Sequence, residues 1–350
     1  MTPASILDGL KARRPAALAR AISQVENGVA GFEALLEAVH EDVGRARRIG
    51  ITGPPGAGKS TLVERLTNAY RQAGLTVGIL AVDPSSPFTG GALLGDRIRM
   101  ERQSLDPGVF IRSMASRGSL GGMATTTAEV ADVMDAYGFD RILIETVGVG
   151  QSELDVIRVA DTTVVVLVPE SGDGIQVMKA GLMEIADVFV VNKADRPGAD
   201  RLRQELEVAL GVRSGNAYRH VPAHHGVDLG GQTPRQDSGH GGTGAQGHGW
   251  EPPVVATVAV KDQGIADLIA ALDRHFDAAQ GSGRLAAQRA RRREQRLREV
   301  VDRALRRWVW SAQGPREALE AGLAEVAAGR QSPYGLAERI VRALEGSVEG

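Results

Sequence analysis

The chain has 350 residues, 43% of them hydrophobic, and a formal net charge of −2. This length allows one large core and a smaller helical unit, and a charge near zero excludes a general attraction to nucleic acid. The absence of cysteine excludes a disulfide framework, a thiolate zinc site and a cysteine nucleophile, and it fits a reducing cytoplasm.

Residues 1–45 are expected to form an N-terminal helical extension. Leu18, Ile22 and Val25 recur at helical spacing, and the pattern predicts two helices between Ile6 and Val43. The mixed, alanine-rich composition lacks the apolar core of a signal peptide, and the longest apolar run, 164–168, is too short to cross a bilayer. We therefore expect a cytoplasmic protein that does not act in a membrane.

Residues 46–280 alternate short apolar runs with amphipathic helical stretches. This alternation is typical of an α/β fold in which helices cover both faces of a mostly parallel sheet. The expected strands are 48–52, 76–82, 109–112, 141–144, 162–168, 188–191 and 254–258. A helix is expected from Ser60 to Ala73, where Gly74 would end it.

Two later segments differ from this pattern. Ser214 to Trp250 is rich in Gly, His, Gln and Ser and has no periodicity, which predicts a flexible surface insertion within the sheet domain. Residues 281–350 are expected to form a C-terminal helical arm. Its parts are a long helix from Arg284 to Ser311 and a helical pair from Arg316 to Leu344.

A phosphate-binding motif follows the first expected strand. Residues 53–60 read GPPGAGKS and match the P-loop pattern G-x-x-x-x-G-K-[ST], in which backbone N–H groups surround phosphates. The lysine of this pattern supplies positive charge and its hydroxyl residue contacts magnesium. The helix that begins here has the N-terminus that anions prefer. The predicted phosphate-binding residues are Gly53, Pro55, Gly56, Ala57, Gly58, Lys59, Ser60 and Thr61.

A second motif distinguishes guanine from adenine. Asn192, Lys193 and Asp195 form an N-K-x-D sequence directly after the apolar run 187–191. A carboxylate there can accept hydrogen bonds from N1–H and the exocyclic amine of guanine, and adenine has no such pair of donors. The two motifs together predict a P-loop NTPase that binds GTP and GDP.

Carboxylates at the ends of expected strands suggest a magnesium site. Asp83 and Glu145 each follow an apolar strand, and Asp96 follows in a glycine-bounded loop. With Ser60 they form the predicted metal-binding set, and Lys59, Asp83, Asp96 and Glu145 form the predicted catalytic set. The alternative for each acidic residue is an ordinary helix cap or turn.

Residues 145–148 have the spacing of the D-x-x-G element of GTPases, with Glu145 in place of Asp. The N–H of Gly148 is placed to sense the γ-phosphate. The next residue is Val149 rather than a water-positioning glutamine, and Gln151 follows two positions later, so we expect slow unaided hydrolysis.

Three longer stretches, 82–100, 117–123 and 145–153, resemble the MeaB/ArgK GTPases. These are chaperones of adenosylcobalamin-dependent acyl-CoA mutases such as methylmalonyl-CoA mutase. The resemblance extends from the helix at 18–26 to the region of Pro333 and Tyr334. It implies a GTPase whose nucleotide state gates the loading of adenosylcobalamin and the removal of damaged cofactor. It also implies a cobalamin adenosyltransferase as a second candidate partner.

The resemblance assigns roles to individual residues of this chain. It implies that Lys59 and Ser60 bind phosphate and magnesium, that Asp83, Asp96 and Glu145 are the acidic set, and that Asn192, Lys193 and Asp195 read guanine. A loop that couples nucleotide state to the mutase matches residues 169–179, with Asp173 and Lys179 as its regulatory contacts; an ordinary turn before a helix is the alternative.

Two features depart from the family's pattern. The insertion 214–250 is longer than the usual connection, and the guanine-closing pair Ser-Ala is replaced by Val258 and Ala259 after Thr257. Because backbone N–H groups make that closing contact, we expect nucleotide binding to be retained.

Other functions remain open from the sequence. The insertion carries five histidines, His220, His224, His225, His240 and His248, which suggests a nickel- or cobalt-inserting GTPase. The lack of cysteine argues against that function. A transport-associated protein kinase or ATPase is a further alternative, although guanine selection is unusual for kinases.

The arginine-rich segment from Arg284 to Arg307 suggests a nucleic-acid contact only at first sight. Leu297, Val301, Leu305 and Trp308 form an apolar stripe along it, which is typical of helix packing. With the family's C-terminal dimerisation arm, this pattern leads us to expect a homodimer that does not bind nucleic acid.

Overall fold

The computed structural model describes residues 3–83, 103–115, 122–146, 156–169, 182–213, 250–311 and 313–345. The chain divides into two compact units, residues 1–289 and residues 290–350. No helix within the described ranges is long and apolar enough to cross a membrane.

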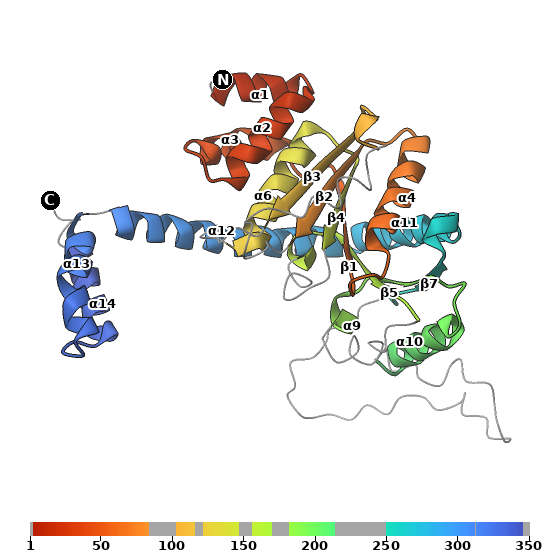
Figure 1. The fold of residues 1–350 in the computed structure, drawn as a ribbon. Coiled ribbons are helices and arrows are strands. Elements are labelled where there is room, and N and C mark those ends of the chain that lie inside the picture. The colour runs from red at the N-terminus through yellow and green to blue at the C-terminus, as the bar shows by residue number, and fades with distance from the viewer. Residues whose placement is uncertain are drawn as a thin grey trace. The chain divides into compact units, whose positions relative to one another are not determined.

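The first unit is built on a parallel seven-stranded sheet with the strand order β3-β2-β4-β1-β5-β6-β7 (Figure 1). The strands are β1 (Arg47–Thr52), β2 (Val77–Asp83), β3 (Val109–Ala115), β4 (Arg141–Thr146), β5 (Thr162–Leu167), β6 (Val188–Asn192) and β7 (Val254–Thr257). All seven predicted strands are present, and β3 is three residues longer than expected. The predicted α/β class is therefore confirmed.

Helices cover both faces of this sheet. On one face, α4 (Lys59–Gln72) and α11 (Ile265–Gly281) pack on the alternate strand residues that include Ile51, Val164 and Val190. On the other face, α6 (Gly122–Tyr137) packs on β2 and β4, and α9 (Leu182–Ile185) and α10 (Ala199–Arg213) pack on β5 and β6. Buried strands with apolar residues on both faces explain the continuous hydrophobic runs of the sequence.

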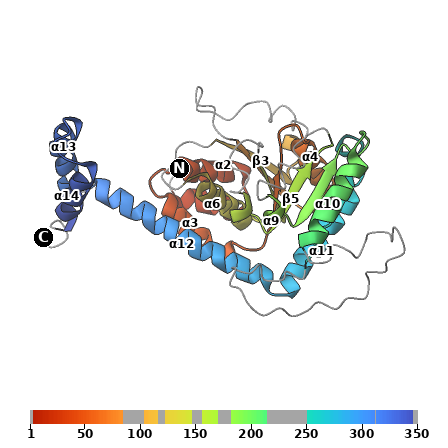
Figure 2. The ribbon, with the colours of Figure 1, turned by 90° about the horizontal axis from the view of Figure 1, so that it is seen from below.

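The N-terminal extension contains three α-helices rather than the predicted two: α1 (Pro3–Lys11), α2 (Pro15–Glu26) and α3 (Phe32–Val39). The first break occurs at Arg13, whose φ is +51°, just before Pro15 begins α2. A proline is favoured in the first turn of a helix but removes a hydrogen bond from a helix interior, which explains the break. These helices share one hydrophobic core with α6, against which they lie in both views (Figures 1 and 2).

A buried ionic network joins the start of the sheet to its surroundings. Arg48, whose side chain is 11% exposed, donates to Asp132 and Asp135 at 2.8 Å each. Burial opposes the charge of Arg48, but the neighbouring carboxylates outweigh it and raise the pKa of the guanidinium. Asp135 also accepts the backbone N–H groups of residues 44–46 at 2.9–3.0 Å. Arg289, at the end of the first unit, binds Asp161 at 2.6 Å.

The second unit contains most of α12 (Arg284–Ser311), followed by α13 (Gln313–Ala327) and α14 (Pro333–Glu345). The helix α12 has the predicted bounds. Helices α13 and α14 pack together through Gly322, because a Cβ atom at this residue would lie 2.2 Å from the side chain of Leu336.

Candidate nucleotide-binding site

The predicted site residues within the described ranges gather at the carboxyl edge of the sheet. The P-loop leaves the end of β1, Glu145 lies near the end of β4, and Asn192 ends β6. In the strand order, β4 separates β1 from β2, which ends at Asp83. In open α/β sheets, ligands bind outside the carboxyl ends of the strands.

Two P-loop glycines are required by close approaches of other groups. Gly53 has φ = +136°, and a Cβ atom there would lie 2.1 Å from the carbonyl oxygen of Val166. Gly58 has φ = +87°, and a Cβ atom there would lie 2.4 Å from Nδ2 of Asn192. A larger residue would be strained by its φ and would collide with its neighbour, so the loop tightness depends on glycine.

Lys59 begins α4 and is 5% exposed. Its Nζ donates to the carbonyl oxygens of Gly53 at 2.8 Å and Pro54 at 3.0 Å, which folds the side chain back along the loop. The ammonium group is therefore held against the backbone of the P-loop, and a cation there can bind a phosphate oxygen.

Ser60 and Glu145 place two oxygen atoms that can act as metal ligands next to each other. The hydroxyl of Ser60 donates to Oε1 of Glu145 at 2.5 Å, and the Glu145 residue is only 4% exposed. Such a pair fits Mg²⁺, which prefers one or two protein oxygens together with phosphate and water. Among the described residues, no group of three or more histidine, aspartate or glutamate side chains is arranged to hold a metal ion.

Asn192 connects the phosphate loop to the loop after β7. Its Nδ2 donates to the carbonyl oxygen of Ala57 at 2.8 Å, while Oδ1 accepts from the Thr257 hydroxyl at 3.0 Å and the Ala259 N–H at 3.2 Å. One donor bond and two acceptor bonds fix the orientation of the amide. Asn192 is 3% exposed, so the connection is buried.

Asp195 lies in the turn after β6 and forms an ion pair with Lys261, with Nζ 2.8 Å from Oδ2. The hydrogen bond from Lys261 lowers the pKa of Asp195 below its ordinary value, which is itself far below neutral pH. Lys193 has φ = +56°, which turns the chain toward this position. An ionised carboxylate is the form that accepts from two guanine donors.

The sequence predicts that backbone N–H groups of the pair Val258 and Ala259 close on guanine. In the structure, both of these N–H groups are hydrogen-bonded within the protein. The N–H of Val258 donates to the carbonyl oxygen of Gln263 at 3.1 Å, and the N–H of Ala259 points to Asn192. Ala259 is thus the member of the pair whose N–H lies beside the predicted guanine-reading residues.

The sequence between residues 18 and 314 matches the family model described as Methylmalonyl Co-A mutase-associated GTPase MeaB. The chain belongs to this family. MeaB-family membership confirms the resemblance predicted from the motifs, and it makes the chain a GTP-hydrolysing enzyme.

Several proteins are similar to this MeaB-family chain along most or part of its length. A Pyrococcus abyssi protein named as a GTPase is 43% identical over 341 residues, which cover 97% of this chain and 96% of the relative. GTPase ArgK of Escherichia coli is 41% identical over 198 residues, 55% of this chain and 60% of ArgK. The mouse protein named Methylmalonic aciduria type A homolog, mitochondrial, is 47% identical over 148 residues, 42% of this chain and 36% of the mouse protein.

A solved structure supports the fold. The crystal structure of a protein named LAO/AO transport system kinase has a TM-score of 0.64 and 26% identity, and the match covers 98% of both chains. The P-loop NTPase architecture with helical extensions is therefore shared over nearly the whole length of both chains.

Several predicted residues lie outside the described ranges. These are Asp96, Gly148, Val149, Gln151, Asp173, Lys179 and the five histidines of the insertion. For Asp83 the structure gives the backbone position alone. Sequence reasoning missed Lys261, which lies 66 residues from Asp195; its position two residues after Ala259 was the available signal.

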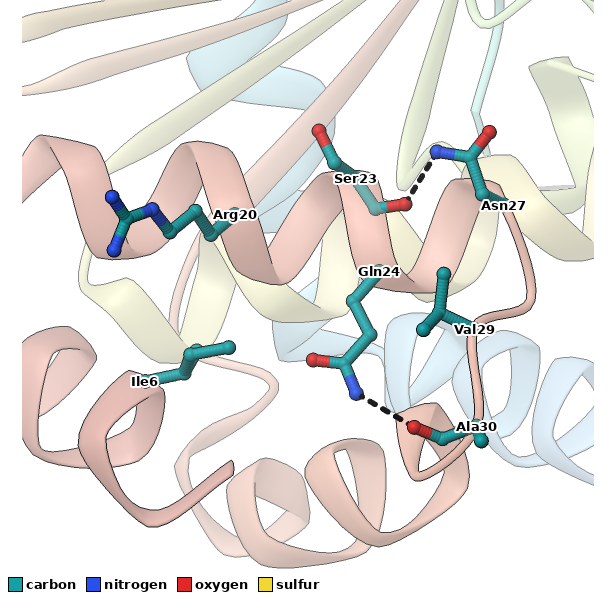
Figure 3. Close-up of a pocket in the computed structure, with 7 residues that line it drawn as sticks. All are labelled: Ile6, Arg20, Ser23, Gln24, Asn27, Val29 and Ala30. Carbon is teal, nitrogen blue, oxygen red and sulfur yellow. Dashed lines mark hydrogen bonds between the residues drawn. The ribbon is translucent and has the colours of Figure 1, made fainter. Parts of the chain in front are cut away.

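An open groove of about 580 Å³ lies elsewhere, between α1, α2 and the loop that follows α2 (Figure 3). Its lining consists of Ile6, Arg20, Ser23, Gln24, Asn27, Val29 and Ala30. Gln24 donates to the Ala30 carbonyl at 3.2 Å, and Asn27 donates to the Ser23 carbonyl at 2.7 Å. These amides hold the helix end and its loop, and the groove contains none of the nucleotide motifs.

Proposed function

We propose that this GTPase gates the loading of adenosylcobalamin into an acyl-CoA mutase, methylmalonyl-CoA mutase or a close relative, and protects the loaded enzyme. The match to a family described by its association with methylmalonyl-CoA mutase supports this proposal most directly. The mouse relative, named for methylmalonic aciduria, supports the same client class. A cobalamin adenosyltransferase is the second partner in this proposal.

In this proposal each part of the site has one task. The backbone N–H groups of 53–61 and the ammonium of Lys59 bind the phosphates, as P-loops do. Ser60, Glu145, Asp83 and Asp96 would hold Mg²⁺, which would supply positive charge next to the phosphate oxygens. Asn192 holds the two loops together, and Asp195 reads guanine.

Hydrolysis by this arrangement rests on positioning. Lys59 stands beside the phosphates and contributes a fixed positive charge, which stabilises a transition state whose charge spreads over phosphoryl oxygens. Because Val149 replaces the usual water-positioning glutamine, we propose that turnover is slow until a client completes the site. The N–H of Gly148 and the segment containing Asp173 and Lys179 would report the nucleotide state to that client.

We also propose that the second unit forms a homodimer contact. The side chains of Leu297, Val301, Leu305 and Trp308 recur along one stripe of α12, and each residue is 45–63% exposed. An apolar stripe of this size usually packs against another helix. Replacing Leu305 with Glu should give monomers in sedimentation velocity at about micromolar concentration; a monomeric wild-type protein at that concentration contradicts the proposal.

The central experiment compares GTP and ATP hydrolysis by the purified full chain, with and without candidate acyl-CoA mutases. We expect GTP turnover alone to be slow and one mutase to raise it, and the Lys59→Ala variant to show no such rise. If no mutase changes turnover or binds in a nucleotide-dependent manner, the mutase role is wrong although the GTPase assignment stands.

The same experiment tests the kinase alternative, which the similarity to a protein named as a transport system kinase keeps open. Phosphoryl transfer from ATP to a transport binding protein would favour that alternative. A clear preference for GTP, with phosphate released to water, favours the G-protein function.

A further inference from the structure

We propose that Lys261 is a specificity-determining residue that orients the Asp195 carboxylate for the exocyclic amine of guanine. The inference rests on the proposed role of Asp195 as the guanine reader. No guanine motif contains Lys261, and its role emerges from the ion pair that joins two turns at the mouth of the site.

The turn that carries Asp195 is fixed by its backbone. The N–H of Ala194 donates to the carbonyl oxygen of Thr257 at 3.0 Å, which ties the turn to the end of β7. Lys193 has a positive φ of +56°, and the N–H of Arg196 donates back to the carbonyl oxygen of Lys193 at 3.0 Å. The Cα of Asp195 therefore has a defined position, and only the side-chain torsions remain to be set.

The turn that carries Lys261 is equally constrained. Its N–H donates to the carbonyl oxygen of Val258 at 2.9 Å, and Val258 pairs with Gln263 across the turn. Gly264 has φ = +75°, and a Cβ atom there would lie 2.2 Å from the carbonyl oxygen of Ala256. The lysine side chain thus extends from a rigid base toward the carboxylate.

In this inference Lys261 fixes the orientation of the plane of the Asp195 carboxylate. The terminal torsion of an Asp side chain is broad, so an unsupported carboxylate rotates between many planes. Two parallel hydrogen bonds to N1–H and the exocyclic amine require the carboxylate to lie in the plane of the base, whereas one bond tolerates rotation. Oδ2 has two lone pairs, so it can accept from Lys261 and from the amine together.

The residues also have the accessibility that this role needs. The side chain of Lys261 is 56% exposed and that of Asp195 is 39% exposed, so both are within reach of an incoming base. An exposed pair contributes little to folding. Loss of Lys261 should therefore change nucleotide selection and leave the fold intact.

The test compares GDP with inosine diphosphate, which lacks the exocyclic amine, by calorimetry on the full chain with Mg²⁺. For Lys261→Met we expect GDP affinity to fall about two- to five-fold, the range that an exposed charged contact supports. Inosine diphosphate affinity should change less, so the ratio of the two affinities falls. Lys261→Arg should restore most of the ratio, because it keeps a cationic donor.

A matched control is Asp262→Asn. Asp262 lies on the same turn as Lys261 and forms an ion pair with Arg65 of α4, and the substitution breaks that pair without contacting Asp195. It should leave both affinities unchanged. Equal losses for the two nucleotides in Lys261→Met would show a merely structural role, and tighter GDP binding would show competition; either result overturns the inference.

Asp195→Ala separates this inference from the assignment on which it depends. If that variant keeps the preference for GDP over ADP, Asp195 does not read guanine and both statements are wrong. If the preference disappears in Asp195→Ala while Lys261→Met leaves the ratio unchanged, the Lys261 inference alone is wrong.

Discussion

Replacing Asn192 with Ala should separate the phosphate loop from the guanine-reading loop. The substitution removes three buried hydrogen bonds, to Ala57, Thr257 and Ala259, at 2.8, 3.0 and 3.2 Å. Each such bond contributes about 1 kcal/mol net. Without these bonds the two loops are less ordered in the free protein, so they lose more conformational entropy when GDP binds. We therefore expect GDP affinity to weaken by about 2–3 kcal/mol, or roughly 30- to 150-fold.

Titration with a fluorescent GDP analogue, followed by calorimetry with unlabelled GDP, measures this loss. Asn68→Ala is the matched control. Asn68 lies on α4 outside the site, and its side chain accepts one hydrogen bond, from Gln103 at 3.3 Å. Affinity within about two-fold of wild type for Asn192→Ala would refute the idea that this amide pre-organises the site.

Three further outcomes are expected. Glu145→Gln removes the carboxylate beside Ser60, so Mg²⁺-dependent GTP turnover should fall at least about tenfold while GDP binding in a chelator is unchanged; unchanged turnover would contradict a metal role. Asp135→Ala leaves Arg48 short of a buried partner and should cost about 3–5 kcal/mol of unfolding free energy in urea, and a cost below about 1 kcal/mol would contradict this. Burial raises the pKa of Tyr70 to about 12, whereas an unfolded tyrosine ionises near pH 10. Its contribution is therefore complete below about pH 10, and roughly 2–3 kcal/mol is lost as the pH rises to 12. Tyr70→Phe should lack that loss in urea unfolding, and identical alkaline profiles for both proteins would argue against it.

The sequence predicted the sheet well for a physical reason. A parallel strand that is buried on both faces must be apolar at nearly every position, and the runs around Ile51, Val166 and Val190 leave no alternative pattern. The P-loop was equally clear, since the turn needs glycine at 53 and 58. The count of N-terminal helices was wrong, because helical periodicity was followed across the break at Arg13, although Pro15, which begins α2, is a sequence signal for a new helix start.

Local motifs thus determined the chemistry: which residues can bind phosphate, hold a hard cation and accept from guanine. The tertiary structure alone decided which distant residues support them. The hydrogen bond from Asn192 to Ala57 joins residues that are 135 positions apart in the sequence, and the bond from Lys261 to Asp195 joins residues 66 positions apart. One sequence alone does not show that two residues so far apart are in contact. The contacts form only when the parallel strands assemble into the sheet and bring their carboxyl ends to one edge.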